Sequence, residues 1–297
     1  MNSAVLRLIL GGVLLGGATL GMADVFSNRS APVQFILEQL VPVGQDPSNY
    51  WRGEPVPLQI TLRYPEAARA ARRAHNARQA EGPVPTLRLC GPGQAWPDLV
   101  TVSLERQIFG WWKPVGGPLN WRAWVWAGAV QKGTDTASVI GSRPLWIPFS
   151  LTPSMTEQLS PGKYRVNAVL DTRKAAGDGW HGQVAATTEF TLRPLSTNPA
   201  DQSRIYLGRA FFARDIQRDP AAEQQLAAKA TQLDPANAVA WHALAKAARS
   251  NRDWSTVVSA GRKYLSLPSK VRPEVDEGRG MVESLVGFAE RKLREKK

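Results

Sequence analysis

The stretch "GEPVPLQITLRY", residues 53–64, decides the fold of the first two thirds of this chain. Its apolar residues at 56, 58, 60 and 62 alternate with polar residues or proline, the period of two that is typical of a β-strand with one buried face. Similar runs, separated by Gly, Pro, Asn and Asp, are "VQFILEQLV", "TLRLC", "LVTVSLERQ", "RAWVWAGAV", "PLWIPFSL", "GKYRVNAVLDT" and "VAATTEFTLRPL". About eight strands with no helices between most of them predict an antiparallel β-sandwich rather than a parallel α/β sheet.

Two motifs in this part resemble the immunoglobulin-like domains of bacterial surface proteins. "YWRGEPVPLQITL" is similar to the entry into the second strand of such domains, and "LSPGKYRVNAVLD" is similar to a turn and strand that come late in them. The resemblance implies an immunoglobulin-like β-sandwich over residues 30–195. It implies nothing about chemistry.

One segment, "PEAARAARRAHNARQAEGP" at residues 65–83, interrupts the strand pattern. Proline suits the first turn of a helix, and the alanines that follow have high helix propensity, so the segment predicts a short helical insertion. Its basic residues either meet an acidic partner or form a solvated helix face. These residues are Arg69, Arg72, Arg73 and Arg78.

From about residue 200 the helical period replaces the period of two, which predicts a domain over residues 200–297. Residues 221–267 resemble a tetratricopeptide repeat: "LDP" at 233–235 closes one unit, "WHALA" from Trp241 occupies the first helix of the next, and "DW" at 253–254 opens its second helix. The last 25 residues, "PEVDEGRGMVESLVGFAERKLREKK", place apolar residues at helical spacing and could cap the stack. In that family stacked helix pairs hold protein segments, so the resemblance implies a protein partner.

Residues 1–27, "MNSAVLRLILGGVLLGGATLGMADVFS", predict export or membrane insertion, because one arginine precedes an uncharged run from 8 to 23. Small residues before Asp24 suit a cleaved signal peptide. A retained anchor is the alternative, since residues 4–23 just reach the length of a membrane span and carry small-xxx-small spacing. The predicted helix-packing residues are Gly12, Gly16, Gly17 and Gly21. In both cases the bulk of the chain lies on the periplasmic or extracytoplasmic side of a bacterial membrane.

The formal charge of +12 is divided equally between the residues before and after 200, which argues against a dedicated nucleic-acid surface. The only cysteine, Cys90, ends an apolar run and is expected to be buried. His75, His181 and His242 lie in three different predicted elements, so no metal site can be assembled, and His242 is expected to be a solvated helix residue. With no nucleophile elbow and no phosphate loop, the sequence predicts a protein without catalytic residues, metal or cofactor.

"FGWWKPVGGPLNWRAWVWAG", residues 109–128, holds five of the eleven tryptophans. If "RAWVWAG" is a strand, both of its faces are apolar, whereas an antiparallel strand with one wet side should alternate. One face is then core, and the other needs a cover: a loop, the helical domain, a sugar or a second protein. The tryptophans predicted to bind a partner are Trp111, Trp112, Trp121, Trp124, Trp126, Trp180 and Trp241.

These features predict an exported, membrane-tethered scaffold or accessory subunit that binds and stabilises a larger membrane-associated protein complex and has no enzymatic activity. The alternative is a carbohydrate-binding module of the cell envelope, with Trp111, Trp112 and Trp180 as its stacking platform. An enzyme whose paired carboxylates meet only in three dimensions is a third hypothesis.

Overall fold

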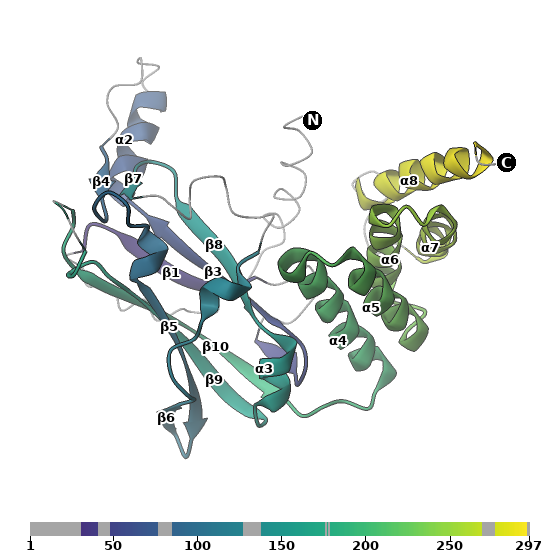
Figure 1. Cartoon of the computed structure of the whole chain (residues 1–297), viewed down its shortest axis with the longest axis horizontal. Helices are drawn as coiled ribbons and strands as arrows, with labels where there is room; N and C mark the ends of the chain where they lie inside the picture. Colours follow the sequence, from purple (N-terminus) through teal and green to yellow (C-terminus); the bar gives the residue numbers. More distant parts are fainter. Residues whose placement is uncertain are drawn as a thin grey trace. The chain divides into compact units, whose positions relative to one another are not determined.

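The computed structural model describes residues 31–40, 48–76, 85–126, 138–175, 177, 179–268 and 277–295. Strands make up the first part of this chain and a stack of helices the second, which confirms the predicted order of β and then α (Figure 1). The predicted hydrophobic helix of residues 1–27, with its four packing glycines, lies outside the described residues. Within the described ranges no helix has both the length and the apolar character that a membrane span requires.

The chain forms two compact units. The first contains residues up to Tyr50 together with Val56–Leu151 and Pro161–Leu192. The second contains Arg193–Lys297 and also takes in two short segments from the strand-rich part, Trp51–Pro55 and Thr152–Ser160.

The first sheet of the strand unit has the order β1-β3-β8, and both pairings are antiparallel. Its strands are β1 (Gln34–Gln39), β3 (Val56–Arg63) and β8 (Leu145–Leu151). Leu37, Ile60 and Ile147 lie opposite one another across the three strands and are all buried. The alternation in residues 53–64 therefore identifies a central strand whose inward face is the core.

The second sheet has the order β2-β10-β9-β5-β6. Its strands are β2 (Asn49–Trp51), β5 (Val100–Ile108), β6 (Trp111–Pro114), β9 (Gly162–Asp171) and β10 (Gln183–Arg193). Antiparallel pairing joins β10 to β9, β9 to β5 and β5 to β6. The buried residues Val102, Ala168 and Ala186 lie opposite one another across β5, β9 and β10. A small third sheet pairs β4 (Leu87–Arg88) with β7 (Val139–Ile140).

The two large sheets share one core. The Trp121 Nε1 donates a hydrogen bond of 3.2 Å to the Val100 carbonyl on β5, and its ring meets Phe149 on β8 edge-on, with 5.4 Å between ring centroids. The predicted helical insertion is helix α2 (Pro65–Asn76), and residues 77–83 lie outside the described part. Cys90 is buried as expected, and this burial raises the pKa of its thiol.

In the part of the chain that the structure describes, five helices form the stack of the second unit, and each packs against the next along the chain. They are α4 (Pro199–Phe212), α5 (Pro220–Leu233), α6 (Ala238–Ser250), α7 (Trp254–Ser266) and α8 (Glu277–Arg294); the short helix α3 (Pro153–Gln158) and the π-helical turn Ala213–Gln217 belong to the same unit. Four of the five stacked helices begin at a side chain that accepts a backbone N–H bond: Asn198, Asp219, Asn237 and Asp253. Buried alanines such as Ala227, Ala230 and Ala243 let neighbouring helices approach closely.

The segment Trp51–Pro55 is held to α4 by two arginines. The Arg204 Nε donates a 2.9 Å hydrogen bond to the buried carboxylate of Glu54, and the Arg209 Nε donates one of 2.7 Å to the Gly53 carbonyl. Burial raises the pKa of Glu54, although the charge of Arg204 opposes the shift. The contact joins positions 150 residues apart in the sequence, which explains how a loop between two strands comes to belong to the helical unit.

Candidate interaction surface

The hairpin between β5 and β6 ends in a tight turn at Phe109 and Gly110. Ile108 and Trp111 form the last pair of the ladder, and the two residues between them have φ angles of 51° and 85°. Two successive positive φ angles are the mark of a type I′ turn, in which asparagine or aspartate normally precedes glycine. A bulky aromatic residue is rarely found at positive φ because of steric strain. The turn therefore carries a phenylalanine that its backbone disfavours.

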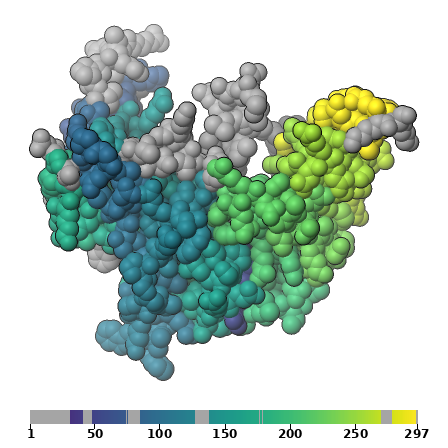
Figure 2. Space-filling view, in the orientation of Figure 1, coloured from purple at the N-terminus to yellow at the C-terminus, as the bar shows by residue number. Residues whose placement is uncertain are grey.

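Both aromatic side chains of this turn are exposed to solvent. Phe109 is 97% exposed and Trp111 is 75% exposed. The hairpin end projects from the strand unit in Figure 1, where β6 is labelled, and its surface protrudes in Figure 2. Single exposed apolar residues are ordinary, but two large aromatic side chains at the end of one projecting hairpin provide a compact apolar contact. We call Phe109, Gly110 and Trp111 the aromatic tip.

Trp112 differs from its neighbour Trp111, because successive side chains of a strand point to opposite faces. Its ring is covered by the guanidinium of Arg165, whose Cζ lies 4.5 Å from the ring centroid, and by the Lys163 Nζ at 5.7 Å. Arg165 in turn donates hydrogen bonds from Nε and Nη2 to one oxygen of Glu105. Partial burial raises the pKa of Glu105, but hydrogen bonds from Asn167 and Arg165 outweigh it and leave this pKa below its ordinary value. Trp112 thus belongs to an internal network of the sheet.

The next three tryptophans do not lie on a strand as predicted. Residues Trp121–Trp124 form a 3₁₀ turn, in which the Ala123 N–H donates to the Asn120 carbonyl at 3.2 Å. After it the chain makes only an isolated bridge to β8, from Val125 to Phe149. The turn directs the Trp121 ring into the core and leaves Arg122 and Ala123 exposed. The prediction of a strand with two apolar faces is therefore wrong for 121–124, and residues 127 and 128 lie outside the described part.

Trp124, Trp126 and Trp241 are half-buried. Trp124 follows the buried Trp121 on the same turn, and the Trp126 N–H donates a 2.9 Å hydrogen bond to the Pro148 carbonyl. Trp241 lies in the helical unit, where its Nε1 donates to the Pro235 carbonyl at 2.9 Å. The Trp241 ring thus has a structural contact, and Trp241 belongs to a different unit from the other two.

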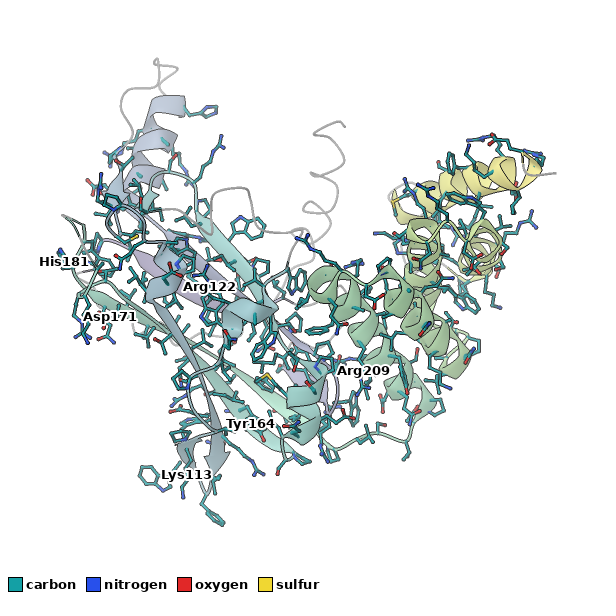
Figure 3. All side chains as sticks on the ribbon, viewed as in Figure 1. Lys113, Arg122, Tyr164, Asp171, His181 and Arg209 are labelled. Atoms are coloured by element: carbon teal, nitrogen blue, oxygen red, sulfur yellow. The ribbon has the colours of Figure 1, made fainter. Side chains whose placement is uncertain are left out.

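Trp180 lies at the other end of the second sheet from the aromatic tip. Its carbonyl accepts a hydrogen bond from Thr172 at the end of β9, whereas Trp112 stacks on Arg165 near the start of that strand. Seven residues of extended strand separate these contacts by roughly 23 Å. Figure 3 shows the same separation, with Lys113 at one end of the sheet and Asp171 and His181 at the other. The structure does not bring Trp111, Trp112 and Trp180 together into one platform.

Phe109 was not among the residues that the sequence singled out for binding. An apolar side chain next to glycine, between two runs of alternating residues, is the pattern that could have identified it. Among the tryptophans predicted to bind a partner, and within the described residues, only Trp111 is highly exposed and lies beside a second exposed aromatic side chain, that of Phe109.

The histidines and acidic residues form no reactive cluster in the described ranges. His75 and His181 are exposed, while His242 is half-buried with its ring 5.4 Å from that of Tyr264, which corrects its expected solvation. No three His, Cys, Asp or Glu side chains are placed to hold a metal ion in the residues that the structure covers. At the β9–β10 hairpin, hydrogen bonds from Arg173 lower the pKa of Asp171 to about 2. This carboxylate stabilises its own turn.

Comparison with known proteins finds no family model that matches the chain and no curated protein that is similar to it. The function is therefore inferred from the residues of this chain alone.

Proposed function

We propose that this protein is an exported, membrane-tethered, non-enzymatic scaffold or accessory subunit that binds and stabilises a larger membrane-associated protein complex through the aromatic tip. The observation that carries the proposal is the exposure of Phe109 and Trp111 at the end of one hairpin. Residues 4–23 serve as the anchor, and the remainder acts on the periplasmic or extracytoplasmic side.

The aromatic tip supports binding because the fold itself gains little from it. The Phe109 side chain buries almost no surface, and its backbone adopts a conformation that costs about 1–3 kcal/mol for a residue of this kind. Tryptophan is enriched among the residues that dominate binding energy at protein interfaces, since it contributes a large rigid apolar surface with one polar group. A protein partner that covers the tip would bury this apolar surface and remove it from water.

The finer architecture that goes with this proposal is an immunoglobulin-like sandwich in residues 30–195. The strand order supports it: β1-β3-β8 corresponds to strands A, B and E of that fold, and β10-β9-β5-β6 corresponds to G, F, C and C′. The buried Tyr164 near the start of β9 stands near the start of strand F, where such domains carry a conserved tyrosine.

For residues 200–297 we propose tetratricopeptide-like helix pairs. The pairs α4 with α5 and α6 with α7 support this, joined by the "LDP" turn at residues 233–235.

The test is co-purification of the full chain in mild detergent without crosslinking. Wild type is expected to bring down stoichiometric membrane-complex partners, and the double variant Phe109→Ser, Trp111→Ser is expected to lose them. Leu195→Ser is the matched control, because Leu195 is also a large apolar residue, 60% exposed, but is not part of the hairpin. Recovery of wild type as a lone monomer, or equal loss of partners from both variants, contradicts the proposal.

The carbohydrate-binding alternative has less support. Trp111 and Trp112 point to opposite faces of the hairpin, and Trp180 lies at the far end of the sheet, so the three rings offer no common stacking surface. Retention of wild type on immobilised glycans, lost on Trp111→Ala, would nevertheless favour this alternative over the scaffold.

A further inference from the structure

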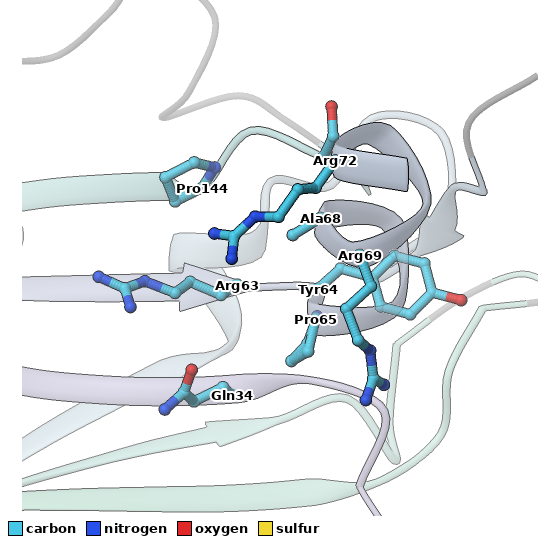
Figure 4. Close-up of a pocket in the computed structure, with 9 residues that line it drawn as sticks. Gln34, Arg63, Tyr64, Pro65, Ala68, Arg69, Arg72 and Pro144 are labelled. Carbon is cyan, nitrogen blue, oxygen red and sulfur yellow. The ribbon is translucent and has the colours of Figure 1, made fainter. Parts of the chain in front are cut away.

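A cavity of about 410 Å³ opens beside helix α2 in the strand unit (Figure 4). It lies where the start of β1, the end of β3, the first two turns of α2 and the segment before β8 come together. The lining residues are Gln34, Arg63, Tyr64, Pro65, Ala68, Arg69, Arg72, Ser142 and Pro144. None of the nine is acidic, and three are arginines.

The three arginines have no carboxylate to neutralise them within the described ranges. Arg63, Arg69 and Arg72 take part in no ion pair there. The acidic residue nearest in sequence, Glu66, accepts a 2.9 Å hydrogen bond from the Tyr64 hydroxyl and does not line the cavity. Three like charges around one cavity repel one another, and an anion bound there would relieve this repulsion.

The helix fixes which of its arginines line the cavity. Positions 65, 68, 69 and 72 follow the spacing i, i+3, i+4 and i+7 and therefore share one face of α2. Ala67 lies off this face and is fully buried, which sets the rotation of the helix about its axis. Arg73, on the same helix, is exposed like the three lining arginines, but it does not line the cavity.

We propose that this cavity binds an anion that carries a phosphate group. A guanidinium donates two parallel hydrogen bonds to phosphate or carboxylate oxygens, so either group would fit one arginine. A lone carboxylate supplies a single negative charge against three positive ones, whereas a phosphate monoester or diphosphate supplies two or more. The Ser142 hydroxyl and the Gln34 amide add donors that suit the remaining phosphate oxygens. The inference goes beyond the scaffold function and does not depend on it.

The test is titration of the full chain in detergent with pyrophosphate, monitored by calorimetry at fixed ionic strength. Wild type is expected to bind, and the double variant Arg69→Gln, Arg72→Gln is expected to bind at least tenfold more weakly, since two charge-assisted contacts are lost. Arg73→Gln removes the same charge from the same helix outside the cavity and is expected to bind as wild type does. Equal weakening of the Arg73→Gln control would show general electrostatic attraction and would overturn the proposal.

A second arm separates a free phosphate compound from a lipid headgroup. Flotation with vesicles of phosphatidic acid in phosphatidylcholine is compared with flotation on phosphatidylcholine alone, so that membrane binding by other parts of the chain cancels. Phosphatidic acid-dependent flotation that the double variant loses assigns the site to a lipid headgroup, and pyrophosphate binding alone assigns it to a soluble ligand. If wild type responds to neither probe, the cavity is not a phosphate site.

Discussion

The guanidinium carbon of Arg165 lies 4.5 Å from the centroid of the Trp112 ring. Trp111, the residue before it, points to the other face and remains 75% exposed. Two adjacent tryptophans therefore have different roles: the first is available to a partner, and the second holds the hairpin to the sheet.

This difference predicts opposite outcomes for the two alanine variants. Trp112→Ala loses its packing and its cation–π contact, so we expect the free energy of unfolding to fall by about 1–2 kcal/mol while partners are still recovered from folded protein. Trp111→Ala should change the free energy of unfolding by less than about 0.5 kcal/mol and should reduce partner recovery. Urea unfolding and detergent co-purification of both variants check this. Loss of stability in Trp111→Ala alone would show that the two assignments are reversed.

The geometry of the turn at the aromatic tip predicts that one substitution raises the stability of the fold and weakens partner binding. Asparagine is the residue that a type I′ turn prefers at the position of Phe109, so Phe109→Asn should raise the free energy of unfolding by about 1 kcal/mol. The same change removes half of the exposed aromatic surface and should weaken partner binding. Thermal unfolding together with co-purification tests it. A variant that is less stable than wild type would indicate that the Phe109 side chain supports the fold.

Helices α7 and α8 pack closely through Gly261. A methyl group at this position would lie 2.4 Å from the Val286 Cγ2, so Gly261→Ala should lower the free energy of unfolding by about 1–3 kcal/mol. Gly287, in the middle of α8, is the matched control, because a methyl group there meets only the far end of Arg291 at 3.9 Å. Gly287→Ala should stabilise the protein by about 0.5–1 kcal/mol through helix propensity. Equal effects of the two substitutions in urea unfolding would contradict this packing.

The sequence predicted the strands well where burial alternates along the chain. Leu58 and Ile60 are buried because their strand has one inward face, and side-chain type at every second position reports that face directly. The same pattern failed at residues 121–124, since tryptophans at 121, 124 and 126 fit more than one periodicity. Whether this segment pairs as a strand depends on its neighbour β8. The two form only an isolated bridge, between Val125 and Phe149.

Other features depend on contacts that no local pattern reports. An apolar residue such as Phe109 is expected to be buried, and only the turn geometry places it in solvent. The inclusion of residues 51–55 in the helical unit follows from the pair of Glu54 and Arg204, which are far apart in sequence. The helical insertion was predicted from composition, but the cavity also needs Arg63 and Ser142 from other elements.

The start of α7 makes the protein sensitive to acid through Asp253. Its carboxylate accepts hydrogen bonds from the backbone N–H of Thr256 at 3.1 Å, from the Ser255 hydroxyl at 2.8 Å and from the Gln224 amide on α5 at 2.8 Å. Hydrogen bonds from Thr256 and Ser255, and then from Gln224, lower the pKa of Asp253 from 3.8 to about 2. A folded-state pKa below that of the unfolded chain means that the carboxylate stabilises the fold above about pH 4, and that this contribution is lost as the pH falls through about 2.

We therefore expect Asp253→Ala to lower the free energy of unfolding by about 1 kcal/mol at pH 7, because the helix loses its N-cap. The difference from wild type should shrink as the pH falls from about 4 towards 2, where the wild-type carboxylate takes up a proton. Asp253→Asn keeps an oxygen for the cap but does not titrate, so it should be less destabilised at pH 7 and should show the same convergence with wild type in acid. Urea unfolding at several pH values, monitored by far-ultraviolet circular dichroism, measures these differences. The contributions of the other carboxylates cancel, because wild type and variant share them. A difference between wild type and Asp253→Ala that stays constant down to pH 2 would mean that Asp253 stabilises α7 by packing and not by its charge.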